Sequence, residues 1–230
     1  MEHDGHEDRS LVSQTFDQFM EDLLDGAWAD HVPPQDVLAK NYDVSRTVLR
    51  EVLAMLLARN MLDIRPKIGT HVRPVHEWRI LNEDVLYWRV RLDPDPRFRE
   101  ALIGFHRLIG PVATAQAAAR GDADDIAAIR LAFDALRESP PGQPGFLAAR
   151  EVFAMRILAA SGNPLFSQLA PLVRGALAVA GRQAVQRKQD WPDTLILYGR
   201  VVDAIRRADA GEAQAAALAL IDHTSPDESG

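Results

Sequence analysis

Apolar residues recur at helical spacing in three segments near the start of the chain. A first helix is expected over residues 10–25, and a short second helix follows from Pro34 to about Asp43. A third helix is expected over residues 45–59, with the side chain of Ser45 as its N-cap. The apolar positions of this third helix are Val48, Val52, Met55 and Leu56.

A short β pattern follows the third helix. Asn60 can end the helix in a left-handed conformation, and residues 61–65 and 70–73 then predict two short strands on either side of a turn. Three helices followed by a hairpin are typical of a winged helix-turn-helix. Residues 10–75 are therefore predicted to form such a domain, with the hairpin as its wing.

The rest of the chain is predicted to be helical. Residues 76–96 are expected to form a linker with a short helix over 77–92 that packs between two domains, because this segment is too apolar for a flexible spacer. Clusters of Gly, Pro, Ser and Asn then divide residues 97–224 into helices. The helices expected there cover residues 97–119, 122–138, 145–161, 164–188, 193–208 and 211–223. The fold class is thus mostly α, a winged helix-turn-helix followed by an all-α bundle of six or seven helices.

Composition and charge narrow the possible functions. The chain has 33 acidic and 26 basic residues, so its formal charge of −7 argues against indiscriminate nucleic-acid binding but allows a local basic patch. The absence of cysteine excludes disulfides and thiolate metal sites. No apolar run approaches the ~20 residues that cross a bilayer, so we expect no membrane partner and a cytoplasmic protein.

A basic surface is predicted around the third helix and the wing. Arg46 and Arg50 lie one turn apart and so project from one side of the helix. Between residues 46 and 73 there are six cations, against the two acids Glu51 and Asp63. Such a helix beside a basic hairpin suits a DNA major groove flanked by phosphates. The alternative is a surface helix whose arginines are only solvated.

Two strings in this region resemble the GntR family of bacterial transcription regulators. Val-Ser-Arg-Thr-x-x-Arg-Glu begins at Val44, and Gly-Thr-x-Val begins at Gly69, at the family's spacing. The resemblance implies contacts to double-stranded, palindromic operator DNA from one set of residues. These are Ser45, Arg46, Thr47 and Arg50, helped by Arg65, Lys67, Gly69 and Lys40.

One departure from the family concerns the second helix. Members commonly open this helix with Pro-Ser-Glu-Arg, and the aligned residues here are Pro33-Pro34-Gln35-Asp36. Because a carboxylate is repelled by DNA phosphates, Asp36 is expected to replace an attractive contact of the family with a repulsive one. Lys40 compensates for this loss only in part. The string from His76 to Trp88 is similar to that of the galactonate-responsive type within the FadR subfamily.

The helical region resembles the FCD ligand-binding domain of that subfamily. The resemblance implies a divalent metal held by an Asp-x-x-x-His pair and two later histidines, above an arginine that grips a carboxylate effector. Arg107, four residues before Pro111, matches that arginine, and a surface or ion-paired arginine is the alternative. Arg150 and Ala154 stand at the Asp and His positions, and Tyr198 stands near the third ligand. His223 is either the last ligand or an ordinary histidine at a helix end.

These substitutions predict a pocket without a metal cofactor. Arg107 and Arg150 are expected to bind an anionic effector jointly, with Tyr198 as a hydrogen-bond partner. The chain contains no motif of a nucleotide-binding loop, a nucleophile elbow or a His-Glu-x-x-His zinc site, so we expect no enzyme activity.

The functional prediction is a homodimeric, ligand-responsive transcription factor. We expect a repressor of genes for a sugar acid or another small carboxylate, associated with the nucleoid through its DNA. One alternative is an orphan regulator with a degenerate pocket that binds DNA constitutively or answers to a protein partner. Another is a helical enzyme with an appended DNA-binding adaptor.

Overall fold

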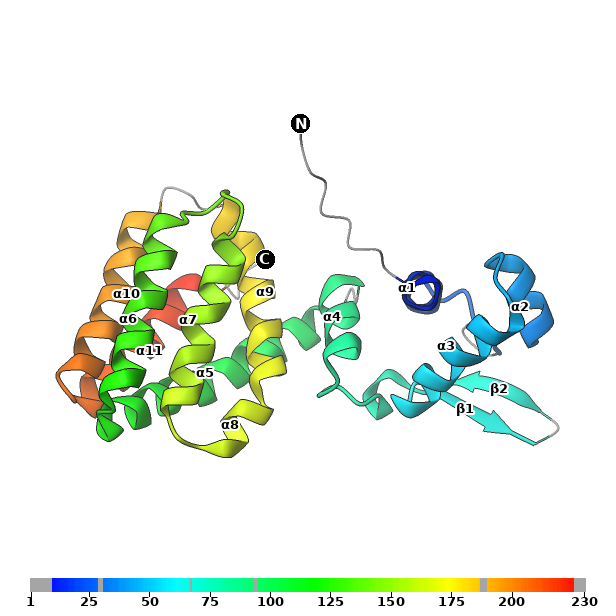
Figure 1. The fold of residues 1–230 in the computed structure, drawn as a ribbon, viewed down its shortest axis with the longest axis horizontal. Coiled ribbons are helices and arrows are strands. Elements are labelled where there is room, and N and C mark those ends of the chain that lie inside the picture. Colours follow the sequence, from blue (N-terminus) through cyan, green and yellow to red (C-terminus); the bar gives the residue numbers. More distant parts are fainter. Residues whose placement is uncertain (1–9, 29–30, 67, 93–94, 187–189, 226–230) are drawn as a thin grey trace. The chain divides into compact units, whose positions relative to one another are not determined.

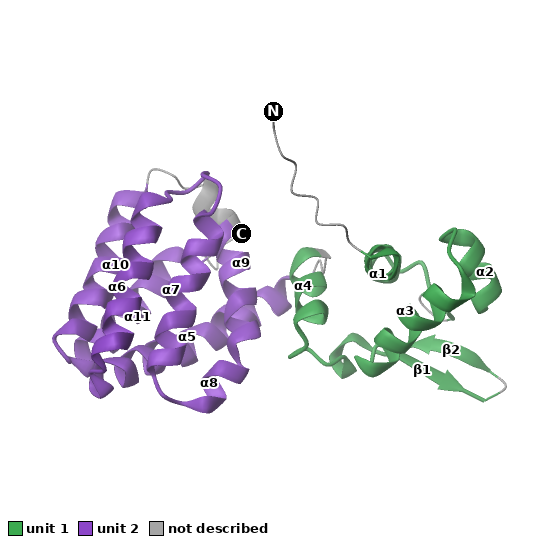
Figure 2. Cartoon of the chain, in the orientation of Figure 1, with its two compact units in different colours: residues 1–93 green, residues 94–230 purple. Residues whose placement is uncertain are grey.

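The computed structural model describes residues 10–28, 31–66, 68–92, 95–186 and 190–225. The chain divides into two compact units, an N-terminal unit Met1–Asp93 and a C-terminal unit Pro94–Gly230, coloured separately in Figure 2. Each unit has its own buried apolar cluster. No helix in the described ranges has both the length and the apolar character needed to span a membrane.

The N-terminal unit is a winged helix-turn-helix, as the sequence predicts. Its helices α1 (Leu11–Leu24), α2 (Gln35–Asn41) and α3 (Arg46–Ala58) precede strands β1 (Leu62–Arg65) and β2 (Gly69–Val72) (Figure 1). The strands pair in antiparallel register from Leu62 opposite Val72 to Arg65 opposite Gly69. Val32, between α1 and α2, adds a single antiparallel bridge to Thr70 and so ties the wing to the helices.

The ends of α3 carry the predicted signals. The Ser45 hydroxyl accepts a hydrogen bond from the Val48 amide at 3.2 Å, and Asn60 takes the left-handed conformation with φ of 60°. The buried face differs from the expected one, because Val48 and Met55 are only partly buried. The fully buried positions of this helix are Leu49, Val52, Leu53 and Leu56.

The segment expected as a linker contributes to the core of the N-terminal unit. It forms a short 3-10 helix η1 (Val75–Glu77) and helix α4 (Glu83–Leu92), and Trp78, Val85 and Trp88 are buried in that core. Arg59 at the end of α3 donates to the Asn82 side chain at 3.2 Å and pairs with Asp84. These contacts place residues 75–92 in the N-terminal unit, whereas the sequence predicted a spacer helix between domains.

The C-terminal unit is an all-α bundle. Its helices are α5 (Pro96–Arg120), α6 (Ala123–Glu138), α7 (Phe146–Ala160), α8 (Pro164–Gln168), α9 (Ala170–Gln186), α10 (Trp191–Arg206) and α11 (Ala210–Thr224). Small buried residues such as Ala113 and Ala117 of α5 and Ala213 of α11 let these two helices pack closely.

One predicted helix of this bundle is divided in two. Residues 164–188 were expected to be continuous, but the chain breaks at Leu169 between α8 and α9. Pro171 explains the break, because its ring has no amide hydrogen and collides with the carbonyl of a preceding helical turn.

Candidate functional site

The start of α3 presents polar side chains to solvent. Ser45, Arg46, Thr47 and Arg50 are all exposed, and the two arginines lie one turn apart. No ion pair of Arg50 is present among the described side chains, so its guanidinium is available to a ligand. The geometry matches a recognition helix whose first two turns face a partner.

Arg46 has an intramolecular partner that the sequence did not predict. Its Nε lies 2.9 Å from Oδ1 of Asp36 on α2, and the two side chains are 74% and 63% exposed. The closest contact of this ion pair is made by Nε, and a guanidinium has further N–H donors on its terminal nitrogens. Asp36, expected to oppose phosphates, thus lies directly beside the first arginine of α3.

The wing carries less free charge than the sequence suggests. Arg65 pairs with Asp63 at 3.1 Å, and Arg73 pairs with Asp63 and with Glu77 at 3.6 and 2.8 Å. Together with the engagement of Arg59 by Asp84, these pairs neutralise much of the counted surplus. Counting cations along the sequence therefore overestimates the basic surface.

Further predicted DNA contacts lie at the wing tip and on α2. Lys40 is exposed in the last turn of α2, and Lys67 lies outside the described residues. Gly69 begins β2 with φ of 117°, and a Cβ there would lie 2.5 Å from the His31 ring. Both the backbone conformation and the neighbouring imidazole favour glycine at this position.

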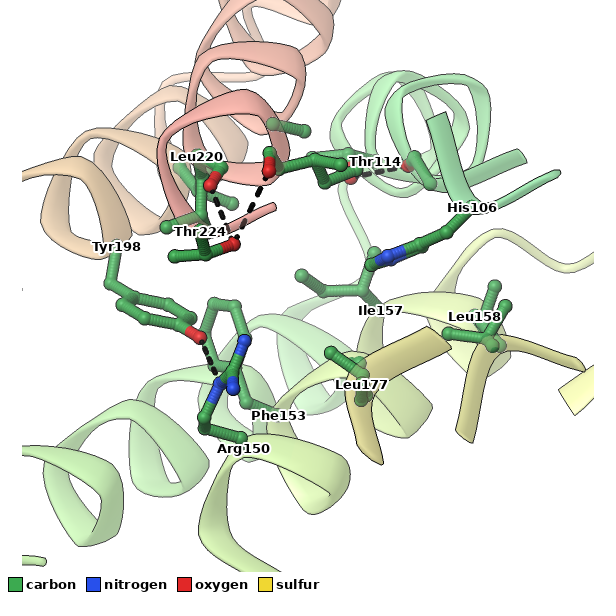
Figure 3. Close-up of a pocket in the computed structure, with 16 residues that line it drawn as sticks. His106, Thr114, Arg150, Phe153, Ile157, Leu158, Leu177, Tyr198, Leu220 and Thr224 are labelled. Carbon is green, nitrogen blue, oxygen red and sulfur yellow. Dashed lines mark hydrogen bonds between the residues drawn. The ribbon is translucent and has the colours of Figure 1, made fainter. Parts of the chain in front are cut away.

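A cavity of about 60 Å³ lies inside the C-terminal unit (Figure 3). It is lined from α5, α7, α9, α10 and α11, mostly by apolar side chains such as Phe153, Ile157 and Leu177. The polar side chains on its wall are His106, Thr114, Arg150, Tyr198 and Thr224. A small apolar space with a few polar groups is typical of a small-molecule site.

Arg150 is the one charged side chain on the described wall of this cavity. It is 3% exposed, and its Nε donates to the Tyr198 hydroxyl at 3.2 Å (Figure 3). The Arg150 Cζ lies 5.6 Å from the centre of the Phe146 ring. Its Nη1 is buried and has no hydrogen-bond partner among the described groups.

His106 of α5 also faces the cavity. Burial of the ring, followed by the positive charge of Arg150, lowers the pKa of His106 to about 4. The imidazole is therefore neutral at pH 7. The hydroxyls of Thr114 and Thr224 donate to the backbone carbonyls of Gly110 and Leu220, so toward the cavity these oxygens serve as acceptors.

Two predicted effector residues lie away from the cavity. Arg107 Nε pairs with Asp222 Oδ1 at 3.1 Å on the outside of the unit, and His223 Nε2 lies 3.1 Å from the Thr194 hydroxyl. The face of α5 next to Arg107 is in part exposed, with Leu108 at 70% exposure. His106, Gly110 and Thr114, spaced by four residues, form the cavity-facing stripe.

Sequence reasoning missed His106, although a signal was present. A histidine followed four residues later by glycine and eight later by threonine places all three on one face of a helix. Arg150, Ala154 and Tyr198, in contrast, are brought together on the cavity wall.

The cavity wall offers few metal donors. His106 supplies one imidazole, while Arg150 and Ala154 supply neither a carboxylate nor a second imidazole. Across the described ranges, no group of three or more His, Asp, Glu or Cys residues converges as a metal site would require.

The lowered pKa of His106 predicts a stability change at acidic pH. The unfolded chain takes up a proton near pH 6.5 and the folded chain only near pH 4, so stability falls as pH falls from 6.5 towards 4. Between pH 7 and pH 5 we expect His106 to account for a loss of about 2 kcal/mol in the free energy of unfolding. Urea denaturation at both pH values measures the loss.

The matched variants are His106→Gln and His76→Gln, the latter at an exposed histidine. The first should remove most of the difference between the two pH values, and the second should retain it. Equal pH dependence in the wild type and in His106→Gln would contradict the prediction.

Comparisons with known proteins agree with this architecture. Residues 11–72 match the model described as bacterial regulatory proteins, gntR family, and residues 93–223 match the FCD domain. The chain is 29% identical over 197 residues, 83% of each chain, to the galactonate operon transcriptional repressor of Escherichia coli K12. It is 27% identical over 200 residues to the uncharacterized HTH-type transcriptional regulator YieP of the same organism, covering 86% of this chain and 84% of YieP.

Two solved structures share the fold. Lar, which controls the expression of the Listeria monocytogenes agr system, has a TM-score of 0.65 and 13% identity, covering 95% of this chain and 96% of its own. A Streptococcus agalactiae GntR protein has a TM-score of 0.50 and 23% identity, covering 92% of this chain and 98% of its own.

Proposed function

Because the chain belongs to the GntR family of bacterial regulatory proteins and carries an FCD domain, we propose that it is a homodimeric repressor that a small anionic effector releases from a palindromic operator. The family assignment makes it a DNA-binding transcriptional regulator with an effector-binding domain, and not an enzyme. Repression, homodimerisation and the effector class are proposals that go beyond the family assignment.

The observation that carries the DNA-binding proposal is the exposed pair Arg46 and Arg50 at the start of α3. An arginine fork matches O6 and N7 of guanine in the major groove, and both forks lie on the same face of the helix. We propose that Ser45 and Thr47 contact the sugar-phosphate backbone of the DNA beside those bases. Lys40, Arg65, Lys67 and Gly69 approach phosphates, which positions the helix without reading sequence.

Two observations support the proposed effector class, the similar protein and the cavity. The similar Escherichia coli protein is the repressor of the galactonate operon, which favours a sugar acid or another small carboxylate here. The buried cation Arg150 on the cavity wall favours an anion over a neutral ligand. A DNA-binding protein of this kind acts in the cytoplasm, associated with the nucleoid.

Homodimerisation is favoured by an exposed apolar pair on α5. Leu108 and Val112, one turn apart, are 70% and 38% exposed. Apolar surface that stays in contact with water does not stabilise an isolated unit. A second copy would cover them, and a two-fold protein matches a palindromic operator.

An orphan regulator is the competing proposal, and one observation favours it. Arg107, which the family resemblance assigned to the effector, pairs with Asp222 outside the cavity. Such a regulator would bind DNA constitutively or through a protein partner.

One experiment separates the two proposals. An operator is first selected from random duplexes by the full-length protein, and its affinity is then measured by gel shift with and without D-galactonate and shorter hydroxy acids. Our proposal requires a palindromic selected sequence and weaker binding with one of the acids. Unchanged binding with every acid would favour the orphan regulator, and selection of no sequence would contradict DNA recognition by α3.

A further inference from the structure

We propose that the cavity of the C-terminal unit binds a short hydroxy carboxylate directly through Arg150 and Tyr198, without a metal ion. The inference rests on the proposed function only in that the unit senses an anion, and it names which groups hold that anion. It assigns to one buried guanidinium the role that the subfamily resemblance gave to a metal.

The state of Arg150 is the first observation. A guanidinium that is 3% exposed has lost most of its hydration, and here only Nε donates to a described hydrogen-bond acceptor, the Tyr198 hydroxyl. Nη1 is buried without a partner among the described groups, on the wall of a cavity (Figure 3). A buried charge in this state is costly unless an anion completes its hydrogen bonds.

Among the residues that the structure describes, the acids next to cavity positions in the sequence supply no counter-ion to Arg150. Glu151 follows Arg150 on α7, but its Oε1 lies 2.8 Å from Arg174 Nε. Asp222 follows the cavity residue Ile221, but it pairs with Arg107 at 3.1 Å. The two acids that adjoin cavity positions in the sequence are thus engaged by other arginines, and no described carboxylate forms an ion pair with Arg150.

Tyr198 adds a second group for a carboxylate. Its oxygen accepts from Arg150 Nε, so its own O–H can donate to an anion held beside the guanidinium. The Phe153 ring packs edge-on against the Tyr198 ring with centroids 5.1 Å apart, which fixes the phenol in place. A carboxylate can therefore receive hydrogen bonds from both the Arg150 fork and the Tyr198 phenol.

The other residues of the cavity wall determine which groups the ligand can carry besides its carboxylate. The Thr114 and Thr224 oxygens act as acceptors toward the cavity, so they can receive hydrogen bonds from hydroxyl groups of a ligand. The remaining side chains are mainly apolar, and the volume is about 60 Å³. These features fit a compact acid with one or more hydroxyl groups.

The same wall does not fit a divalent metal. Ala154, one turn after Arg150, offers only a methyl group, and His106 is the single imidazole. A metal site needs about four convergent donors, and the fixed positive charge of Arg150 repels a cation.

The test uses the full-length protein and four acids, namely glycolate, lactate, glycerate and gluconate, with lactamide as the uncharged counterpart of lactate. Thermal unfolding and calorimetry are run with and without EDTA. The variants are Arg150→Met, which keeps an unbranched side chain but shortens it and removes its charge, and Arg156→Met, a matched change at an exposed position of the same helix.

We expect at least one acid to raise the melting temperature of the wild type and of Arg156→Met, equally with EDTA. Lactamide should give no shift. Arg150→Met should lose the shift and bind that acid at least a hundredfold more weakly. Without ligand, Arg150→Met should melt higher by roughly 2–5 °C, because it removes a buried charge that pairs with no carboxylate in the described part of the chain.

Each of several results would overturn the inference. These are no shift with any of the acids, an equal shift with lactamide, loss of binding in EDTA, retained binding by Arg150→Met, or a lower melting temperature of ligand-free Arg150→Met. Operator binding is measured separately. An acid that binds through Arg150 without releasing DNA would leave the inference intact and contradict only the proposed response.

Discussion

Replacing Arg50 by alanine is expected to weaken operator binding by roughly 1–3 kcal/mol per half-site, and by twice that for a dimer on a palindrome. Arg50 is exposed on the face of α3 that begins at Ser45, and no ion pair with another described side chain competes for its guanidinium. The whole gain of its contact with a guanine is therefore lost in the variant. Gel-shift titration on the selected operator at fixed salt measures the loss.

Arg46→Ala should lose somewhat less than Arg50→Ala. Arg46 has to share or break its 2.9 Å ion pair with Asp36 when it meets DNA, although an exposed pair of this kind is worth at most about 1 kcal/mol. The control is Arg79→Ala, an exposed arginine of the same unit that lies outside α3 and the wing. Arg50→Ala with wild-type affinity, or Arg79→Ala with an equal loss, would remove α3 as the recognition helix.

Local signals explain why most of the fold could be predicted from sequence. Ser45 and Asn60 mark the ends of α3 through the chemistry of caps, and these depend only on neighbouring backbone atoms. The breaks between helices of the C-terminal unit follow Gly and Pro for the same reason. The break at Leu169 is also local, since the Pro171 ring disrupts the turn that precedes it.

Contacts between distant residues explain what the sequence did not predict. The apolar residues Trp78, Val85 and Trp88 correctly indicate a packed segment, but nothing in their spacing says which unit they pack against. The Asp36–Arg46 pair joins two helices across a turn, and the spacing of the two residues along the chain gave no sign of it. The family resemblance assigned Arg107 to the effector, but the structure pairs Arg107 with Asp222 outside the cavity and places His106 on the cavity wall instead.

The family resemblance predicted only part of the candidate pocket. It identified Arg150, Ala154 and Tyr198 from their positions in the sequence, and the structure places all three on one cavity wall. It could not show that Arg150 is buried with an unpartnered nitrogen, because burial depends on the packing of α7 against its neighbours. That property, rather than the alignment, is what points to an anion.

Asp36→Arg is expected to strengthen operator binding about tenfold per half-site, and so about a hundredfold on a palindrome. The change removes a carboxylate that lies near the expected path of the phosphates and adds a cation in its place. It also frees Arg46 Nε from its 2.9 Å partner, so Arg46 meets DNA without first losing an ion pair. The slope of log affinity against log salt should steepen by about 1 per half-site, because each added phosphate contact releases counter-ions.

Two variants separate the contributions to this gain. Asp36→Asn removes the negative charge alone and should give a smaller gain, while Gln35→Arg adds an exposed cation to α2 and leaves the Asp36–Arg46 pair in place. If Asp36→Arg and Asp36→Asn both bind the operator more weakly than the wild type at every salt concentration, Asp36 has a positive role. It would then hold Arg46 with its two terminal nitrogens towards a guanine, or accept from a cytosine amine itself. In that case, the replacement of the family's cation by Asp36 changes which DNA bases α2 and α3 recognise. Operators selected by Asp36→Asn would then carry a different base at the contacted position.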